Sequence, residues 1–191
     1  MLLFFIIPIV LAGVRKYSPK YAFTSWELYP LYAVELVHIF FQVNAYFGNY
    51  QFVQYSSYIQ TAMNISLLLP IISKKLYVTA LVGSGSVLAG SALNAIIINA
   101  NDGHMPVYAT LSKLTGFFHE TALGSTVDEL HIIMSDATRL NFLGDYIDLG
   151  FCIMSPGDIL IHFFVSAVIY CTVKSAAINA KKVITEGKQN G

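Results

Sequence analysis

Several ionisable side chains lie in stretches of sequence that are otherwise apolar, and these are the first candidates for chemistry. Glu35 and His38 are three residues apart in one such stretch, so on a helix they share one face. Ionisable residues inside a bilayer are costly, and they usually face a helix bundle or a water-filled cavity. The pair therefore predicts either structural contacts between helices or a proton path or ligand contact.

Polar residues also gather in three clusters in the second half of the chain. Asn101-Asp102-Gly103 is typical of a turn, because Asn and Gly tolerate the positive φ of a chain reversal. Ser155 fits a helix N-cap, and it puts Asp158 in the first turn, where the helix dipole favours a carboxylate. We expect the clusters to meet at one membrane boundary, with these candidate binding residues: Asn94, Asn101, Asp102, His104, Arg139 and Asp148.

The elements that must position these residues are long apolar runs. The chain has 191 residues, of which 55% are hydrophobic and 12% charged, whereas about a quarter of a soluble domain is charged. Runs near the roughly 20 residues that cross a bilayer core occur at 28–48, 52–73, 77–98 and 155–173, and residues 1–14 are interpreted as a short first span. The sequence therefore predicts an all-α fold, a polytopic membrane helix bundle of about five spans forming one domain over 1–191.

The distribution of charge predicts an orientation. Eleven basic and eleven acidic residues give no net charge, so the basic surface typical of a nucleic-acid binder is missing. In the five-span arrangement nine of the eleven basic residues lie on one side, while segment 101–157 on the other side carries seven acidic and two basic residues. The positive-inside rule then predicts a multi-pass cell-membrane protein with segment 101–157 outside and the tail 174–191 in the cytoplasm.

The outer segment is too long and too apolar for a plain connector, so we expect it to be structured. Pro106 suits the first position of a helix that lies on the membrane surface. Residues 126–129 (Thr-Val-Asp-Glu) are typical of a capping box at the start of a second helix. These features predict a helical extracytoplasmic cap, with either a packing or a substrate-gating role. As the one arginine among seven acids, Arg139 is expected to pair with Asp145 or Asp136.

Three motifs give the chain a resemblance to a known family. They are Asn-x-Gly-x-Met-Pro at 101–106, Leu-Gly-Asp at 143–145 and Ser-x-Gly-Asp at 155–158. From about Leu88 to the end of the last span, the chain resembles a family of small bacterial integral membrane proteins of unknown function. The resemblance supports the membrane assignment and implies no particular activity.

A more remote resemblance covers the last third of the chain. Asp-Tyr-Ile-Asp at 145–148, followed by Ser-Pro-Gly-Asp at 155–158, is similar to the end of the lipoprotein signal peptidases, which are membrane aspartyl proteases. The resemblance implies that Asp145 and Asp158 are the catalytic pair and that Arg139 is the basic residue ahead of them. In such a pair two nearby carboxylates share a proton, and one activates water while the other polarises the scissile carbonyl.

Two functions from different classes are consistent with these features. The first is a non-enzymatic membrane component, either partner-binding or transport-related, and the transport form uses Glu35 and His38. The alternative is a membrane-embedded aspartyl peptidase acting on lipidated or membrane-anchored peptides at the outer leaflet. No spacing of His or Cys predicts a metal site, and no motif predicts a cofactor. The expected partners are the lipid bilayer and other membrane proteins or lipidated peptides, and not nucleic acid.

Overall fold

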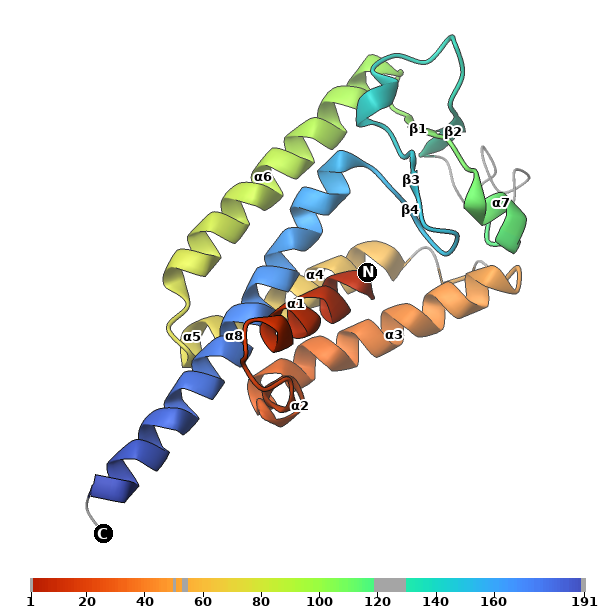
Figure 1. Ribbon diagram of the computed structural model, residues 1–191. Helices are drawn as coiled ribbons and strands as arrows, with labels where there is room; N and C mark the ends of the chain where they lie inside the picture. The colour runs from red at the N-terminus through yellow and green to blue at the C-terminus, as the bar shows by residue number, and fades with distance from the viewer. Residues whose placement is uncertain (1, 50, 53–54, 119–129, 190–191) are drawn as a thin grey trace. The chain divides into compact units, whose positions relative to one another are not determined.

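The structure is a computed structural model that describes residues 2–49, 51–52, 55–118 and 130–189, and most of these residues are helical (Figure 1). The chain divides into two compact units. Unit 1 comprises residues 1–39, 58–84 and 162–191, and unit 2 comprises residues 40–57 and 85–161. The mainly α fold class agrees with the sequence prediction.

The described residues form the following helices and strands, given in chain order. The helices are α1 (Leu3–Val14), α2 (Lys20–Thr24), η1 (Trp26–Leu28), α3 (Tyr29–Tyr46), α4 (Ser56–Ser66), α5 (Leu68–Ser73), α6 (Tyr77–Ala100), α7 (Leu111–Thr115), η4 (Asn141–Leu143) and α8 (Pro156–Gln189). The strands are β1 (Met105–Val107), β2 (His131–Ile133), β3 (Ile147–Asp148) and β4 (Ile153–Met154).

Unit 1 is built around a cluster of apolar side chains from most of its helices. Residues of η1, α3, α4 and α8 meet there, and its large, fully buried side chains include Leu28, Leu31, Met63, Leu67, Val168 and Ile169. A polar contact also joins two helices of this unit: Ser166 Oγ of α8 donates to the Phe4 carbonyl of α1 at 2.8 Å. This core buries the polar residues Glu27 and Glu35 together with the apolar ones.

Unit 2 contains two small sheets, and these correct the prediction of a helical cap. β1 and β2 pair in parallel, with Met105 opposite His131, and β3 pairs antiparallel with β4. The predicted helix from Pro106 is wrong, since Pro106 lies in β1, where its carbonyl accepts the Asp145 N–H at 3.0 Å. The five-residue helix α7 follows later, and β2 lies at His131–Ile133, where the second predicted helix would continue. The capping box at 126–129 falls outside the described residues.

The number of predicted spans also needs correction. Within the described part of the chain, two helices are long and apolar enough to cross a membrane, Tyr77–Ala100 and Pro156–Glu186. α1 has 12 residues, about 18 Å at 1.5 Å per residue, which is shorter than a bilayer core. The run at 52–73 divides into α4 and α5, and α3 carries polar residues that lower its hydropathy. The prediction of about five spans is therefore wrong by this criterion.

Candidate functional site

The sequence candidates Glu35 and His38 lie together on α3 in unit 1. His38 Nδ1 is 3.6 Å from Glu35 Oε2, and 5% of the Glu35 side chain is exposed against 19% for His38. Neither carboxylate oxygen of Glu35 nor Nδ1 of His38 has a hydrogen-bond partner among the described residues. A buried carboxylate without hydrogen-bond donors is costly when it is charged, and the neighbouring His38 imidazole is a group that can offset this cost.

A second buried carboxylate in unit 1 was not among the sequence candidates. Glu27 in η1 is 4% exposed, and its Oε1 lies 2.7 Å from Lys74 Nζ at the end of α5. The fully buried Leu31 lies four positions from both Glu27 and Glu35, and residues four apart on a helix are neighbours. That spacing is a signal in the sequence, but nothing local identified Lys74 as the partner.

In unit 2, Asp158 acts as part of a helix cap at the start of α8. Its Oδ2 accepts the Ser155 N–H at 3.0 Å, and Ser155 Oγ accepts the Asp158 N–H at 3.0 Å. This reciprocal pair is a capping box, in agreement with the N-cap position inferred for Ser155. Asn94 of α6 donates to Asp158 Oδ1 at 2.9 Å and accepts from Ser155 Oγ at 2.9 Å.

Two glycines allow the backbones of α6 and α8 to approach each other beside this cap. A Cβ on Gly157 would lie 2.7 Å from the Gly90 carbonyl oxygen and would overlap the Asn94 amide. A Cβ on Gly90 would lie 2.9 Å from Ile161 Cγ1. Gly90 and Gly157 therefore serve close helix packing, in which small residues let two backbones meet.

The Asn101 side chain binds the backbone of Arg139, which lies 38 positions later in unit 2. Its amide donates to the Arg139 carbonyl and accepts the Arg139 N–H, at 2.9 and 2.8 Å. His104 Nδ1 lies 3.2 Å from the Asn101 carbonyl, and Asp102 is exposed with φ 54°, as expected of a turn. The Arg139 side chain is exposed, and no carboxylate of the described residues lies within 4 Å of it, so the predicted ion pair with Asp145 or Asp136 is wrong.

Asp148 organises the loop that leads into α7. Its Oδ2 accepts the backbone N–H groups of Thr110 and Ser112 at 2.6 and 2.9 Å, and Oδ1 accepts the Gly150 N–H at 2.8 Å. Burial alone would raise the pKa of Asp148, but the hydrogen bonds from Ser112, Gly150 and Thr110 outweigh it and lower the pKa to about 2. This arrangement gives Asp148 a structural role.

Asp145 lies beside β1, opposite Val107. It is 6% exposed, and its Oδ2 is 3.4 Å from Nε2 of His131. The contacts of Asp145 therefore involve His131, whereas those of Asp158 involve Asn94 and Ser155. The catalytic pairing of Asp145 with Asp158 stays a prediction.

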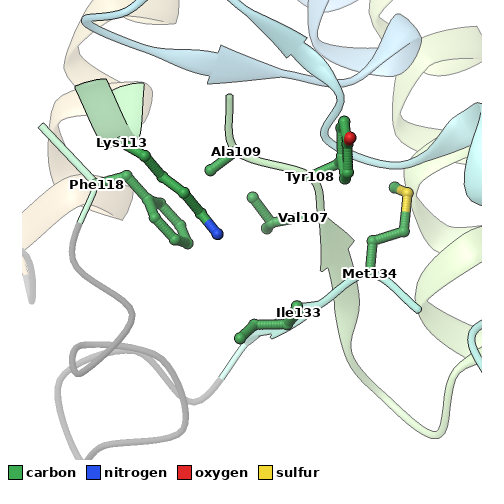
Figure 2. A pocket seen from close by; sticks show the side chains of 7 residues that line it. All are labelled: Val107, Tyr108, Ala109, Lys113, Phe118, Ile133 and Met134. Atoms are coloured by element: carbon green, nitrogen blue, oxygen red, sulfur yellow. The ribbon is translucent and has the colours of Figure 1, made fainter. Parts of the chain in front are cut away.

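A cavity of about 100 Å³ lies near this sheet in unit 2. Figure 2 shows the Lys113 side chain reaching into it alongside the ring of Phe118, with the ammonium 5.8 Å from the ring centroid. The lining is mostly apolar and consists of Val107, Tyr108, Ala109, Lys113, Phe118, Ile133 and Met134. Within the described residues, no three His, Cys, Asp or Glu side chains gather as a metal site.

Comparison with known proteins gives one match. The model of a family of unknown function, DUF5317, matches residues 21–170. The chain belongs to the DUF5317 family. No curated protein and no solved structure matches it.

Every candidate residue of this DUF5317 protein lies within the matched region, from Glu27 to Asp158. Helix α1 and the C-terminal part of α8 lie outside it. The family assignment agrees with the predicted membership of a family of unknown function and adds no activity, so the function must be argued from the residues.

Proposed function

We propose that this DUF5317 protein is an integral membrane protein in which α6 and α8 cross the bilayer. The support is the exposure of α6: only 17% of its apolar stretch is buried, and Val78, Leu81 and Leu88 are 78%, 76% and 71% exposed. A core helix of a soluble protein would be mostly buried. Exposed apolar surface on this scale needs a hydrophobic surrounding, which lipid provides.

The basic residues favour one orientation for these two helices. Lys74 and Lys75 precede α6, and Lys174, Lys181 and Lys182 lie toward the far end of α8. The connection between the two helices carries the acidic excess of segment 101–157. Under the positive-inside rule the C-terminus is then cytoplasmic and the connection is outside.

We further propose that the protein is non-enzymatic and transport-related, and that it binds a proton at Glu35. The single observation that carries this is a carboxylate, 5% exposed, with both oxygens lacking hydrogen-bond donors among the described residues. Structural carboxylates elsewhere in the chain differ, since Asp148 and Asp158 accept several N–H groups. A buried Glu beside a His is typical of proton relays in membrane proteins.

His38 supplies the neighbouring site for the proton. At 3.6 Å its Nδ1 is slightly beyond a hydrogen bond, so a small rotation brings the two groups into contact. A proton on the imidazole makes an ion pair with the carboxylate, and a proton on the carboxylate leaves both groups neutral. Either form removes the cost of an isolated buried charge.

The proposal is tested in proteoliposomes that contain a trapped pH-sensitive dye. After an acid jump outside, vesicles with the wild-type protein should acidify faster than empty vesicles. Glu35→Gln should return the rate to that of empty vesicles, whereas Glu186→Gln, at an exposed carboxylate of α8, should keep the wild-type rate. Equal rates in wild-type and empty vesicles, or in wild-type and Glu35→Gln vesicles, would overturn the proposal and favour the partner-binding form.

A hydrophobic carbodiimide gives a second readout that does not need flux. This reagent modifies protonated carboxyl groups in apolar surroundings, so mass spectrometry should locate an adduct on Glu35 and none on Glu186. An unlabelled Glu35 under acidic conditions would contradict proton binding there.

A further inference from the structure

We propose that unit 1 carries a surface that binds the phosphate groups of anionic phospholipids. The surface, named here the basic belt, consists of Arg15, Lys16, Lys20, Lys75 and Lys174. It requires the membrane insertion proposed above, but it is independent of proton binding at Glu35.

Two contacts within unit 1 connect the segments that carry the residues of the basic belt. The rings of Tyr17 and Tyr170 lie 6.4 Å apart, which places the connection after α1 beside α8 one turn before Lys174. The Glu27–Lys74 ion pair of 2.7 Å joins η1 to the end of α5, next to Lys75. Residues distant in the sequence thus contribute positive charge to one region.

The charge of the basic belt is not neutralised by the protein. All five residues are exposed. No carboxylate oxygen of the described residues lies within 4 Å of a side-chain nitrogen of any of them. Glu27, the acid in the neighbouring η1, is already paired with Lys74. Five cations without acidic partners therefore attract an anionic partner.

The backbone shows that two of these lysines occupy unusual positions. α1 and α5 each end in a Schellman motif, closed by hydrogen bonds from Tyr17 to Ala12 and from Leu76 to Ile71, both 2.9 Å. The residue at the left-handed position of such a motif is usually glycine, but here it is Lys16 with φ 62° and Lys75 with φ 55°. A lysine in both strained positions is consistent with a use for its ammonium group.

Aromatic residues identify the surrounding as a membrane interface. Phe23, Trp26 and Tyr29 are 66%, 58% and 53% exposed on α2, η1 and the start of α3. Trp and Tyr concentrate where the hydrocarbon core meets the headgroups. Since basic residues at the cytoplasmic boundary bind anionic headgroups, phospholipid phosphate fits the basic belt better than an acidic protein.

The experiment measures binding of short-chain phosphatidylglycerol to the detergent-purified full chain at low ionic strength, with short-chain phosphatidylcholine as the comparison lipid. The wild-type protein should bind phosphatidylglycerol, and phosphatidylcholine much more weakly. Lys16→Gln/Lys75→Gln should lower the apparent affinity by about thirtyfold, the effect of two lysines near an anionic surface. The matched variant Lys181→Gln/Lys182→Gln removes the same charge outside the basic belt and should change the affinity by less than about threefold, since lysines outside the contact contribute little.

Several results would overturn the proposal. Equal binding of both lipids would exclude anionic recognition, and an equal loss in the two double variants would mean that net charge alone decides. Competition by inorganic phosphate at millimolar concentration would indicate a free-phosphate site instead. Lys16→Arg/Lys75→Arg keeps the charge and should bind like the wild type, so a folded but non-binding arginine variant would also contradict the proposal.

Discussion

Glu27 and Lys74 form a 2.7 Å ion pair in which 5% and 20% of the two side chains are exposed. The pair joins η1 to the end of α5, across 47 positions of sequence. Since Glu27 Oε2 has no hydrogen-bond partner among the described residues, Lys74 is the group that compensates this carboxylate.

Removing Lys74 should therefore be more damaging than removing the whole pair. We expect Lys74→Met to lower the free energy of unfolding by about 3–5 kcal/mol, because it leaves a buried charge without compensation. Thermal unfolding in detergent measures the effect. Glu27→Leu/Lys74→Met should recover most of the loss, and a double variant as unstable as the single one would contradict the compensation.

The close approach at Gly157 should be sensitive to one added methyl group. Gly157→Ala introduces a Cβ 2.7 Å from the Gly90 carbonyl and against Asn94, so we expect a loss of about 1–3 kcal/mol from overpacking. Gly85→Ala is the matched control on α6, because nothing lies within 4 Å of its Cβ. Equal unfolding temperatures for the two variants would show that the helices do not pack through Gly157.

The cap at Asp158 makes the peptidase alternative testable. Asp158→Asn keeps the side-chain shape, and as a cap substitution it should cost about 1 kcal/mol or less. Under the structural role, any measured function stays at the wild-type level. Hydrolysis of a lipidated peptide by the wild type, lost in folded Asp145→Asn and Asp158→Asn proteins, would establish the alternative.

Asp148 should make part of the stability depend on pH. Its pKa is lowered from 3.8 to about 2, so its stabilisation is present above pH 4 and is lost as the pH falls through 2. Asp148→Asn should destabilise the protein at pH 7 and have little further effect near pH 2. Proteolysis of the loop at 108–115, followed across this range, measures the difference; a constant gap between variant and wild type at all pH values would contradict it.

Labelling tests the proposed orientation. In a background where Cys152 and Cys171 are replaced by serine, Lys113→Cys should react with an impermeant maleimide in intact cells, and Lys182→Cys should react only after lysis. Both positions are exposed, so accessibility of the side chain itself is not limiting. The opposite labelling pattern would invert the topology.

The parts of the structure that sequence could predict are those with local signals. α6 and α8 are long apolar runs, Ser155 and Asp158 form a capping box within four residues, and Glu35 and His38 share a face by spacing alone. Helix periodicity and capping depend on near neighbours, so these inferences need no knowledge of the fold.

The parts that sequence could not predict depend on distant partners. Pro106 fits the start of a helix locally, yet β1 pairs with β2 about 26 residues later, and that pairing decides its conformation. Glu27 finds Lys74, while Arg139, predicted to bind an acid, instead has its backbone bound by Asn101. Tertiary contacts override local preference in such short elements.

The Asn101 side chain joins the two ends of segment 102–138, and this determines how well the segment should tolerate added residues. By binding both the N–H and the C=O of Arg139, it imitates a neighbouring peptide group and fixes the two ends of a loop that runs from 102 to 138. Closing such a loop costs conformational entropy that grows only with the logarithm of its length, about 0.6 kcal/mol for each doubling. An epitope or small domain inserted at the exposed Asp136–Ala137 peptide should therefore leave both closing hydrogen bonds in place.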